Sequence, residues 1–330
     1  MSLVNHCRTV LHDLLGEARH CLPKVFLLTA IVQIELFFQS LVLSAYGILD
    51  AVQGVYHMQS ESIYQKTVLL WKNLAIQTPA SLNWYLDSFR VLFAYHSAKI
   101  ENDAISYNDT HEIFHSGKVS SFTGNPRTLF EQQNQKTCYE FLIPRIIAKE
   151  PITLGLVKEV HAILTAGTYD ERRYLEKEER PGEFKKHDYV TGLLEVGSSP
   201  EDVPHDIALL LTEIEDLTES KSIQPETLLK AATYFHARFE YIHPFADGNG
   251  RVGRTLLNYF LMSNDHPPLI VYEEDRSLYF EGLRSYDRQE NLDPLFTFFL
   301  FAIEKTWEKW VERTLGDNKE VVKSRLKDLI

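Results

Sequence analysis

Cysteine is scarce in this sequence, and positive charge is outnumbered by negative charge. The 330 residues include only Cys7, Cys21 and Cys138, which gives no disulfide framework, and an odd count fits a reducing compartment better than a secreted one. Lysine and arginine number 34 against 46 aspartate and glutamate, so the formal net charge is −12. This charge repels phosphate backbones and disfavours DNA or RNA as a partner. We therefore expect a cytoplasmic protein that does not bind nucleic acid.

One long apolar stretch interrupts an otherwise ordinary composition. Residues 25–49 carry a single charge, Glu35, and are long enough to span a bilayer. Inserting Glu35 into a membrane would cost roughly 2.5–3.5 kcal/mol. Polar residues also recur along one side of the segment as a helical stripe: Thr29, Gln33, Ser40 and Ser44. We favour a buried or dimer-forming helix, which would suit a homodimer, and keep membrane contact by residues 25–49 as the less favoured alternative.

Apolar residues elsewhere recur at helical rather than alternating spacing, as in Leu228, Ala232, Phe235 and Phe239. The sequence therefore predicts a mainly α protein, with one short β-hairpin between residues 184 and 196. We divide the chain into a helical N-terminal extension (1–70), a helical region (71–150), a core (151–310) and a C-terminal helix (311–330).

A loop rich in glycine opens a helix between His243 and Arg254, where the sequence is HPFADGNGRVGR. Free N–H groups at a helix start, and glycines that let a ligand approach the backbone, form an anion site. Arg251 and Arg254 are three residues apart, which places both on one helical face. Asp247 supplies the kind of carboxylate that holds Mg²⁺ beside phosphates, and His243 supplies a base able to work near pH 7. The combination predicts phosphoryl or nucleotidyl transfer.

This segment resembles the signature of the Fic family, HxFx(D/E)GNGRxxR, at every specified position. The resemblance implies a Fic-type helical core and protein adenylyltransferase activity, in which AMP passes from ATP to a hydroxyl side chain of a target protein. It further implies that His243 deprotonates the target hydroxyl and that Asp247 holds Mg²⁺. The residues it assigns to the phosphates of ATP are Gly248, Asn249, Gly250, Arg251, Val252, Gly253 and Arg254.

Two further segments resemble elements of that family. Residues 181–192 are similar to its hairpin flap, along which a target protein binds by strand addition. Residues 276–283 are similar to its adenosine-contacting segment, with Tyr279 as the ring contact. The chain departs from the family at Lys185 and Asp287, where relatives often carry arginine and asparagine. The flap residues expected along the nucleotide are Tyr189, Val190, Thr191 and Gly192.

The upstream segment Ser97–Asn102, with the sequence SAKIEN, resembles the inhibitory motif (S/T)xxxE(G/N) of the same family. Found before the core, this motif marks autoinhibited members, in which its glutamate pairs with the second arginine of the signature. The resemblance therefore implies that Glu101 pairs with Arg254 and holds the enzyme inactive. A carboxylate in the fork of a guanidinium group would compete directly with the γ-phosphate of ATP.

Other interpretations of the sequence stay open. A de-AMPylating Fic enzyme, or one that transfers another nucleotidyl or phosphoryl group, is the first alternative, and a catalytically silent protein-interaction module is the second. The run Gly248–Gly253 also fits the dinucleotide fingerprint GxGxxG, although no buried strand precedes it. The pairs His187-Asp188 and His205-Asp206, with His161 and His236, suggest a metal-dependent phosphohydrolase, but such dipeptides arise often by chance.

Overall fold

The computed structural model describes residues 62–101, 105–119, 122–189, 197–218 and 223–327. They belong to one structural unit, which begins at Ser62. The apolar stretch 25–49 lies outside the described residues, so the homodimer and the membrane contact stay predictions. Among the residues that are described, no helix is both long enough and apolar enough to cross a bilayer.

The prediction of a mainly α protein is confirmed, and no strand occurs in the described ranges. The α-helices are α3 (Ile63–Asn73), α4 (Pro79–Tyr85), α5 (Asp87–Glu101), α6 (Tyr107–Ser116), α7 (Pro126–Ile147), α8 (Leu154–Leu164), α9 (Val203–Thr218), α10 (Pro225–Ile242), α11 (Asn249–Ser263), α12 (Arg276–Gln289) and α13 (Asp293–Lys327). A π-helical turn, η1 (Arg172–Glu176), and a 3₁₀ turn, η2 (Glu273–Asp275), complete the elements. Of the hairpin expected at 184–196, residues 184–189 contain no strand and residues 190–196 lie outside the described ranges.

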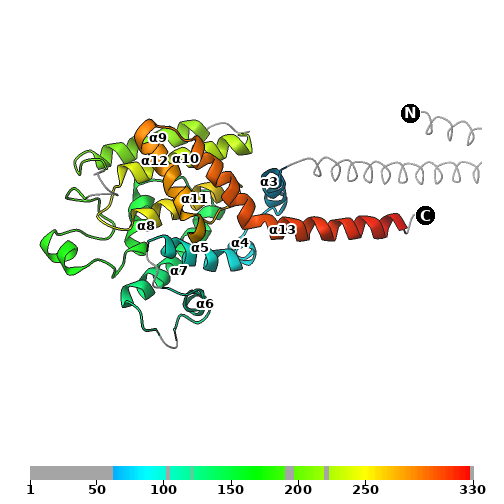
Figure 1. Cartoon of the computed structure of the whole chain (residues 1–330), viewed down its shortest axis with the longest axis horizontal. Helices are drawn as coiled ribbons and strands as arrows, with labels where there is room; N and C mark the ends of the chain where they lie inside the picture. Colours follow the sequence, from blue (N-terminus) through cyan, green and yellow to red (C-terminus); the bar gives the residue numbers. More distant parts are fainter. Residues whose placement is uncertain (1–61, 102–104, 120–121, 190–196, 219–222, 328–330) are drawn as a thin grey trace, which may run out of the picture. The chain divides into compact units, whose positions relative to one another are not determined.

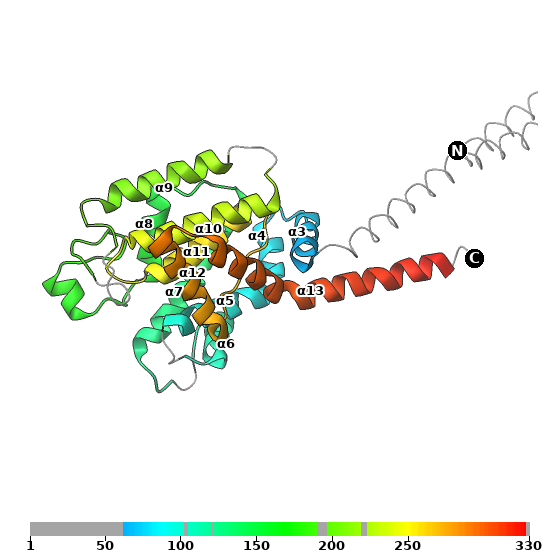
Figure 2. The ribbon, with the colours of Figure 1, turned by 45° about the horizontal axis from the view of Figure 1, so that its top comes forward.

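Helix α11 lies among α5, α7, α8 and α10, as Figures 1 and 2 show. All of its residues except Gly250 are buried, although it carries two arginines and two asparagines. These polar side chains are satisfied by the surrounding chain: Asn258, for example, donates to the carbonyl of Leu269 at 2.9 Å and accepts from its N–H at 2.8 Å. The loop before α11 is therefore attached to a helix that is fixed on all sides.

The connection between α10 and α11 is short because the backbone turns sharply at His243. This residue follows the last residue of α10 and has the left-handed backbone conformation φ 51°, ψ 61°, which is uncommon for residues other than glycine. Pro244 comes next and has no N–H with which to continue the helix. Helix α10 ends at Ile242 for these two reasons, and α11 begins at Asn249.

Two of the domain boundaries expected from the sequence fall inside helices. The boundary between residues 70 and 71 cuts α3, which buries Tyr64, Val68 and Trp71 and packs on α13. Helix α13 continues through residue 311 without a break, so the C-terminal helix expected at 311–330 is the end of a longer helix. The boundary between residues 150 and 151 falls in the connection between α7 and α8.

Trp307 joins α13 to α3 and α5, and we expect its removal to destabilise the unit. Its ring meets Trp71 edge-on at a centroid distance of 5.2 Å and stacks on Phe89 at 5.9 Å, while its Nε1 donates to the carbonyl of Pro268 at 2.7 Å. Trp307→Ala should lower the free energy of unfolding by about 3–5 kcal/mol. Trp84, 74% exposed on α4, is the matched control, and its replacement by alanine should cost less than about 0.5 kcal/mol. Urea unfolding followed by circular dichroism measures both, and equal losses would contradict this packing.

Candidate active site

The loop before α11 is closed by the side chain of Asn249. Its Oδ1 accepts the N–H of Phe245 at 2.9 Å, and its Nδ2 donates to the carbonyl of Phe245 at 2.8 Å. Gly248 between them has φ 81°, and an added Cβ would lie 2.7 Å from Cγ2 of Thr165, so only glycine fits. The amide of Asn249 therefore shapes the loop. Helix α11 begins with no side-chain cap, which leaves the N–H groups of its first turn to an external anion.

Glu101 and Arg254 form the ion pair expected from the inhibitory motif. Nη2 of Arg254 donates to Oε1 of Glu101 at 2.9 Å and to the carbonyl of Ser97 at 3.0 Å, and Nε donates to Oγ of Ser97 at 3.1 Å. The guanidinium is buried, whereas 44% of the Glu101 side chain is exposed. The serine and the glutamate of the motif thus hold the same arginine, from successive turns of α5.

The carboxylate of Glu101 lies over the first turn of α11. A Cβ added to Gly250 would lie 2.3 Å from Oε1 of Glu101 and 2.9 Å from Nη1 of Arg254. A side chain at this position would therefore displace the carboxylate. Glu101 occupies the place that the loop, the helix N-terminus and Arg254 together make favourable for an anion.

His243 is held as a neutral imidazole beside this anion position. Burial lowers the pKa of His243 to about 4, and the positive charge of Lys185 acts in the same direction. At pH 7 the ring is therefore unprotonated and can accept a proton. Its backbone N–H donates to the carbonyl of Phe239 at 3.1 Å, which fixes the residue at the end of α10.

Asp247 belongs to a network of ion pairs that links the loop to α7. Its Oδ2 accepts Nη2 of Arg127 at 2.6 Å, and its Oδ1 accepts the N–H of Gly248 at 2.8 Å. Glu131 bridges Nε of Arg127 at 2.9 Å and Nη1 of Arg251 at 3.2 Å. Burial works against the charge of Asp247, but Arg251 and Arg127 outweigh it and hold its pKa below the usual value. Asp247 is thus ionised at neutral pH.

The two arginines of the loop motif have different partners, although the spacing predicts one face. Arg254 is directed to α5, where Ser97 and Glu101 lie, and Arg251 is directed to Glu131 on α7. Helix α5 therefore contacts α11 through Arg254, and α7 contacts α11 through Arg251.

Lys185, in the segment expected to form the flap, and Ser198, beyond the end of that segment, are bonded to the backbone on either side of His243. The N–H of Lys185 donates to the carbonyl of Pro244 at 2.9 Å, and the N–H of Ser198 donates to the carbonyl of Ile242 at 3.0 Å. The hydroxyl of Tyr189 donates to Oε1 of the buried Glu179 at 3.0 Å. The other three flap residues expected along the nucleotide lie outside the described residues: Val190, Thr191 and Gly192.

Tyr279 has no exposed surface and lies near Arg254. Its hydroxyl is 2.7 Å from Nε2 of His236, which is itself fully buried. Glu240 lies near Tyr279 and Arg254, and burial raises the pKa of Glu240 to about 8. The ring contact between Tyr279 and adenosine stays a prediction, and it would require this side chain to be uncovered first.

His161 supports the loop in a way that the sequence did not reveal. Its ring stacks on Phe245 at a centroid distance of 3.7 Å, its Nε2 lies 3.1 Å from the carbonyl of Asp247, and its Nδ1 accepts the N–H of Gly182 at 2.8 Å. These contacts argue against His161 as a metal ligand, and no cluster of three or more metal-binding side chains occurs among the described residues. The only signal in the sequence was a histidine in an apolar helix.

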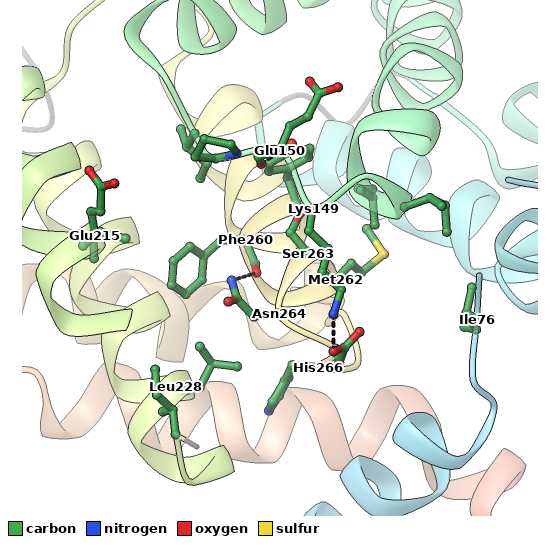
Figure 3. A pocket seen from close by; sticks show the side chains of 18 of the residues that line it. Ile76, Lys149, Glu150, Glu215, Leu228, Phe260, Met262, Ser263, Asn264 and His266 are labelled. Carbon is green, nitrogen blue, oxygen red and sulfur yellow. Dashed lines mark hydrogen bonds and ion pairs between the residues drawn. The ribbon is translucent and has the colours of Figure 1, made fainter. Parts of the chain in front are cut away.

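A large cavity of about 1340 Å³ lies at the other end of α11. Figure 3 shows part of its lining, in which Met262, Ser263 and Asn264 come from the last turn of α11 and its end. Lys149 and Asp265 form an ion pair at this cavity, and His266 lies beside them. The residues that line the cavity include none from the loop motif.

Comparison with known proteins bears on the same segment. The profile of the Fic/DOC family matches residues 151–261. The chain is 26% identical to Protein adenylyltransferase Fic of Drosophila persimilis over 227 residues, which are 67% of this chain and 40% of that protein. It is 33% identical to Protein adenylyltransferase Fic of Drosophila erecta over 134 residues, 40% of this chain and 26% of that protein. The chain thus spans less than half the length of these relatives.

Solved structures share the fold. A Fic domain containing signaling protein from Bacteroides thetaiotaomicron superposes with a TM-score of 0.66 at 22% identity, over 77% of this chain and 97% of that one. Fic-1 from C. elegans superposes with a TM-score of 0.58 at 23% identity, over 94% of this chain and 93% of that one. Residues 151–261 therefore match the Fic/DOC family, and the helical fold of the chain is the one that these Fic proteins share.

Proposed function

We propose that this chain is a protein adenylyltransferase that transfers AMP from ATP to a hydroxyl side chain of a target protein, and that Glu101 holds it inactive. The observation that carries the proposal is the uncapped start of α11, where an anion position lies beside the neutral imidazole of His243. The names of the relatives from Drosophila persimilis and Drosophila erecta support the reaction class.

In this reaction His243 takes the proton of the target hydroxyl while the oxygen attacks the α-phosphorus of ATP. The bond from oxygen to the α-phosphorus forms as the bond between the α-phosphorus and the bridging oxygen breaks. Pyrophosphate leaves with the electron pair of the broken bond. The N–H groups at the start of α11 and the charges of Arg251 and Arg254 would stabilise the phosphates.

Asp247 is the residue that would hold Mg²⁺. Its carboxylate is ionised, and its side chain is 20% exposed at the site. Mg²⁺ is commonly bound by one or two carboxylates together with substrate phosphates, so a single aspartate beside a phosphate site fits this ion. Bound there, Mg²⁺ would supply positive charge against the leaving pyrophosphate.

We place the target protein along residues 181–192. Lys185 and Ser198 are bonded to the backbone on either side of His243, so a segment paired with this flap would pass close to the imidazole. The hydroxyl to be modified would then be presented to His243 by main-chain pairing.

Removing Glu101 should activate the enzyme. Glu101→Gly frees Arg254 and the first turn of α11, and the lost charge-assisted hydrogen bond is worth about 1.5–3 kcal/mol, so transfer should rise about tenfold or more. Incorporation from α-labelled ATP measures the rate, and intact-mass spectrometry identifies the added group. Glu290→Gly, at the exposed end of α12, is the matched control and should behave as the unsubstituted chain. Equal activity of the Glu101→Gly variant and the unsubstituted chain would remove the autoinhibition from the proposal.

Removing His243 should abolish transfer and leave nucleotide binding intact. In the Glu101→Gly background, His243→Ala should lower the rate about 10²–10⁴-fold because the base is lost. ATP affinity by calorimetry should stay within about threefold, since the start of α11 is unchanged. His205→Ala, exposed on α9, is the control. Transfer that persisted without His243 would show that another group takes the proton.

The pH profile of the Glu101→Gly variant should be flat between pH 6 and pH 8. The folded pKa of His243, about 4, lies below its usual value, so the ring is already neutral at pH 6. A histidine with the usual pKa near 6.5 would lose about fourfold in rate between pH 8 and pH 6. Initial rates at saturating ATP measure this, and a fourfold fall would contradict the environment described for His243.

A further inference from the structure

Arg127 reaches the site from the first turn of α7 and is not part of the loop motif. Its Nη2 donates to Oδ2 of Asp247 at 2.6 Å. The other oxygen of Asp247 accepts the N–H of Gly248 at 2.8 Å and lies 3.9 Å from Nη2 of Arg251. Both carboxylate oxygens are therefore engaged within the chain itself.

The side chain of Arg127 is more exposed than those of Glu131 and Arg251 in this network of ion pairs. The side chains of Glu131 and Arg251 are 7% and 6% exposed, whereas that of Arg127 is 32% exposed. Oε1 of Glu131 accepts both Nε of Arg127 at 2.9 Å and Nη1 of Arg251 at 3.2 Å, so without Arg127 it would keep Arg251 as a partner. If Arg127 turned toward solvent, Glu131 and Arg251 would therefore stay paired, and Asp247 would be the carboxylate that loses its nearest cation.

A metal ion bound at Oδ2 of Asp247 would compete with Arg127 for that oxygen. A divalent cation on Oδ2 of Asp247 would face the guanidinium at close range, and both are positively charged. An ion that binds Asp247 must therefore either displace Arg127 or bind less tightly beside it.

We propose that Arg127 is an internal substitute for the metal ion: it neutralises Asp247 in the nucleotide-free chain and must leave Asp247 when Mg²⁺ binds with ATP. This inference rests on the proposed function, because it takes Asp247 as the metal ligand. Glu101 and Arg127 then occupy two separate parts of one site, the first as an anion in the place of phosphate and the second as a cation in the place of Mg²⁺.

The test measures how strongly Mg²⁺ improves nucleotide binding. The probe is α,β-methylene-ATP, whose bridging carbon prevents transfer, and the protein is the full chain with Glu101→Gly. Calorimetry gives the dissociation constant in EDTA and in excess Mg²⁺, and the ratio of the two is the Mg²⁺ enhancement. Arg127→Gln should raise this ratio about tenfold over the parent, because the competitor for Asp247 is gone. Arg127→Lys, which keeps the cation, should leave the ratio near that of the parent.

Control variants separate this inference from general effects of charge. Arg90→Gln removes an arginine that is paired with an aspartate, Asp87, and is similarly exposed at 26%, and it should leave the ratio unchanged. Adding Asp247→Asn to Arg127→Gln should abolish the tenfold gain. Thermal melting of each variant checks that the fold is kept.

Two results would overturn the inference, and they differ in what they say of the proposed function. If Arg127→Gln leaves the ratio unchanged while Asp247→Asn lowers it, Asp247 holds the metal and Arg127 does not compete for it. If Asp247→Asn leaves the ratio unchanged in every variant, the metal assignment in the proposed function fails together with the role of Arg127.

Discussion

The charge that α11 carries into the interior is the constraint on which the rest of the site depends. The helix buries two guanidinium groups and begins with an uncapped turn. Leaving a buried cation without a partner costs several kcal/mol, so each must meet an anion. Glu101 on α5 and Glu131 on α7 meet this need, and they tie both helices to α11.

The same constraint bears on both the stability of the site and the ligand binding proposed for it. Glu101 and Glu131, the anions nearest to the two arginines, come from outside residues 151–261, and Glu101 is half-exposed. Under the proposed function, a ligand with phosphate groups would replace a carboxylate of the chain without leaving an arginine unpaired. The arginines that hold these carboxylates would thus be the same charges that bind phosphate.

The sequence alone predicts the helical class and the contents of the loop, because both depend on local pattern. Helical spacing marks α10, and the run HPFADGNGRVGR marks the turn and the start of α11. The contacts of Arg127, Glu131 and His161 could not be predicted, because they join helices far apart in the chain and no local spacing records them. Burial of Tyr279 was missed for the same reason: a helical pattern shows an apolar face but does not show which helix covers it.

The bonds of residues 185 and 198 to the backbone around His243 would, under the proposed function, limit the choice of target. A segment paired with 181–192 would be recognised mainly through its main chain, and its side chains would matter mainly for whether they allow an extended course. Selectivity would then depend on the local backbone shape that a target can adopt. A flexible loop or tail with one hydroxyl aligned with His243 would be a better substrate than a folded surface with many hydroxyl groups.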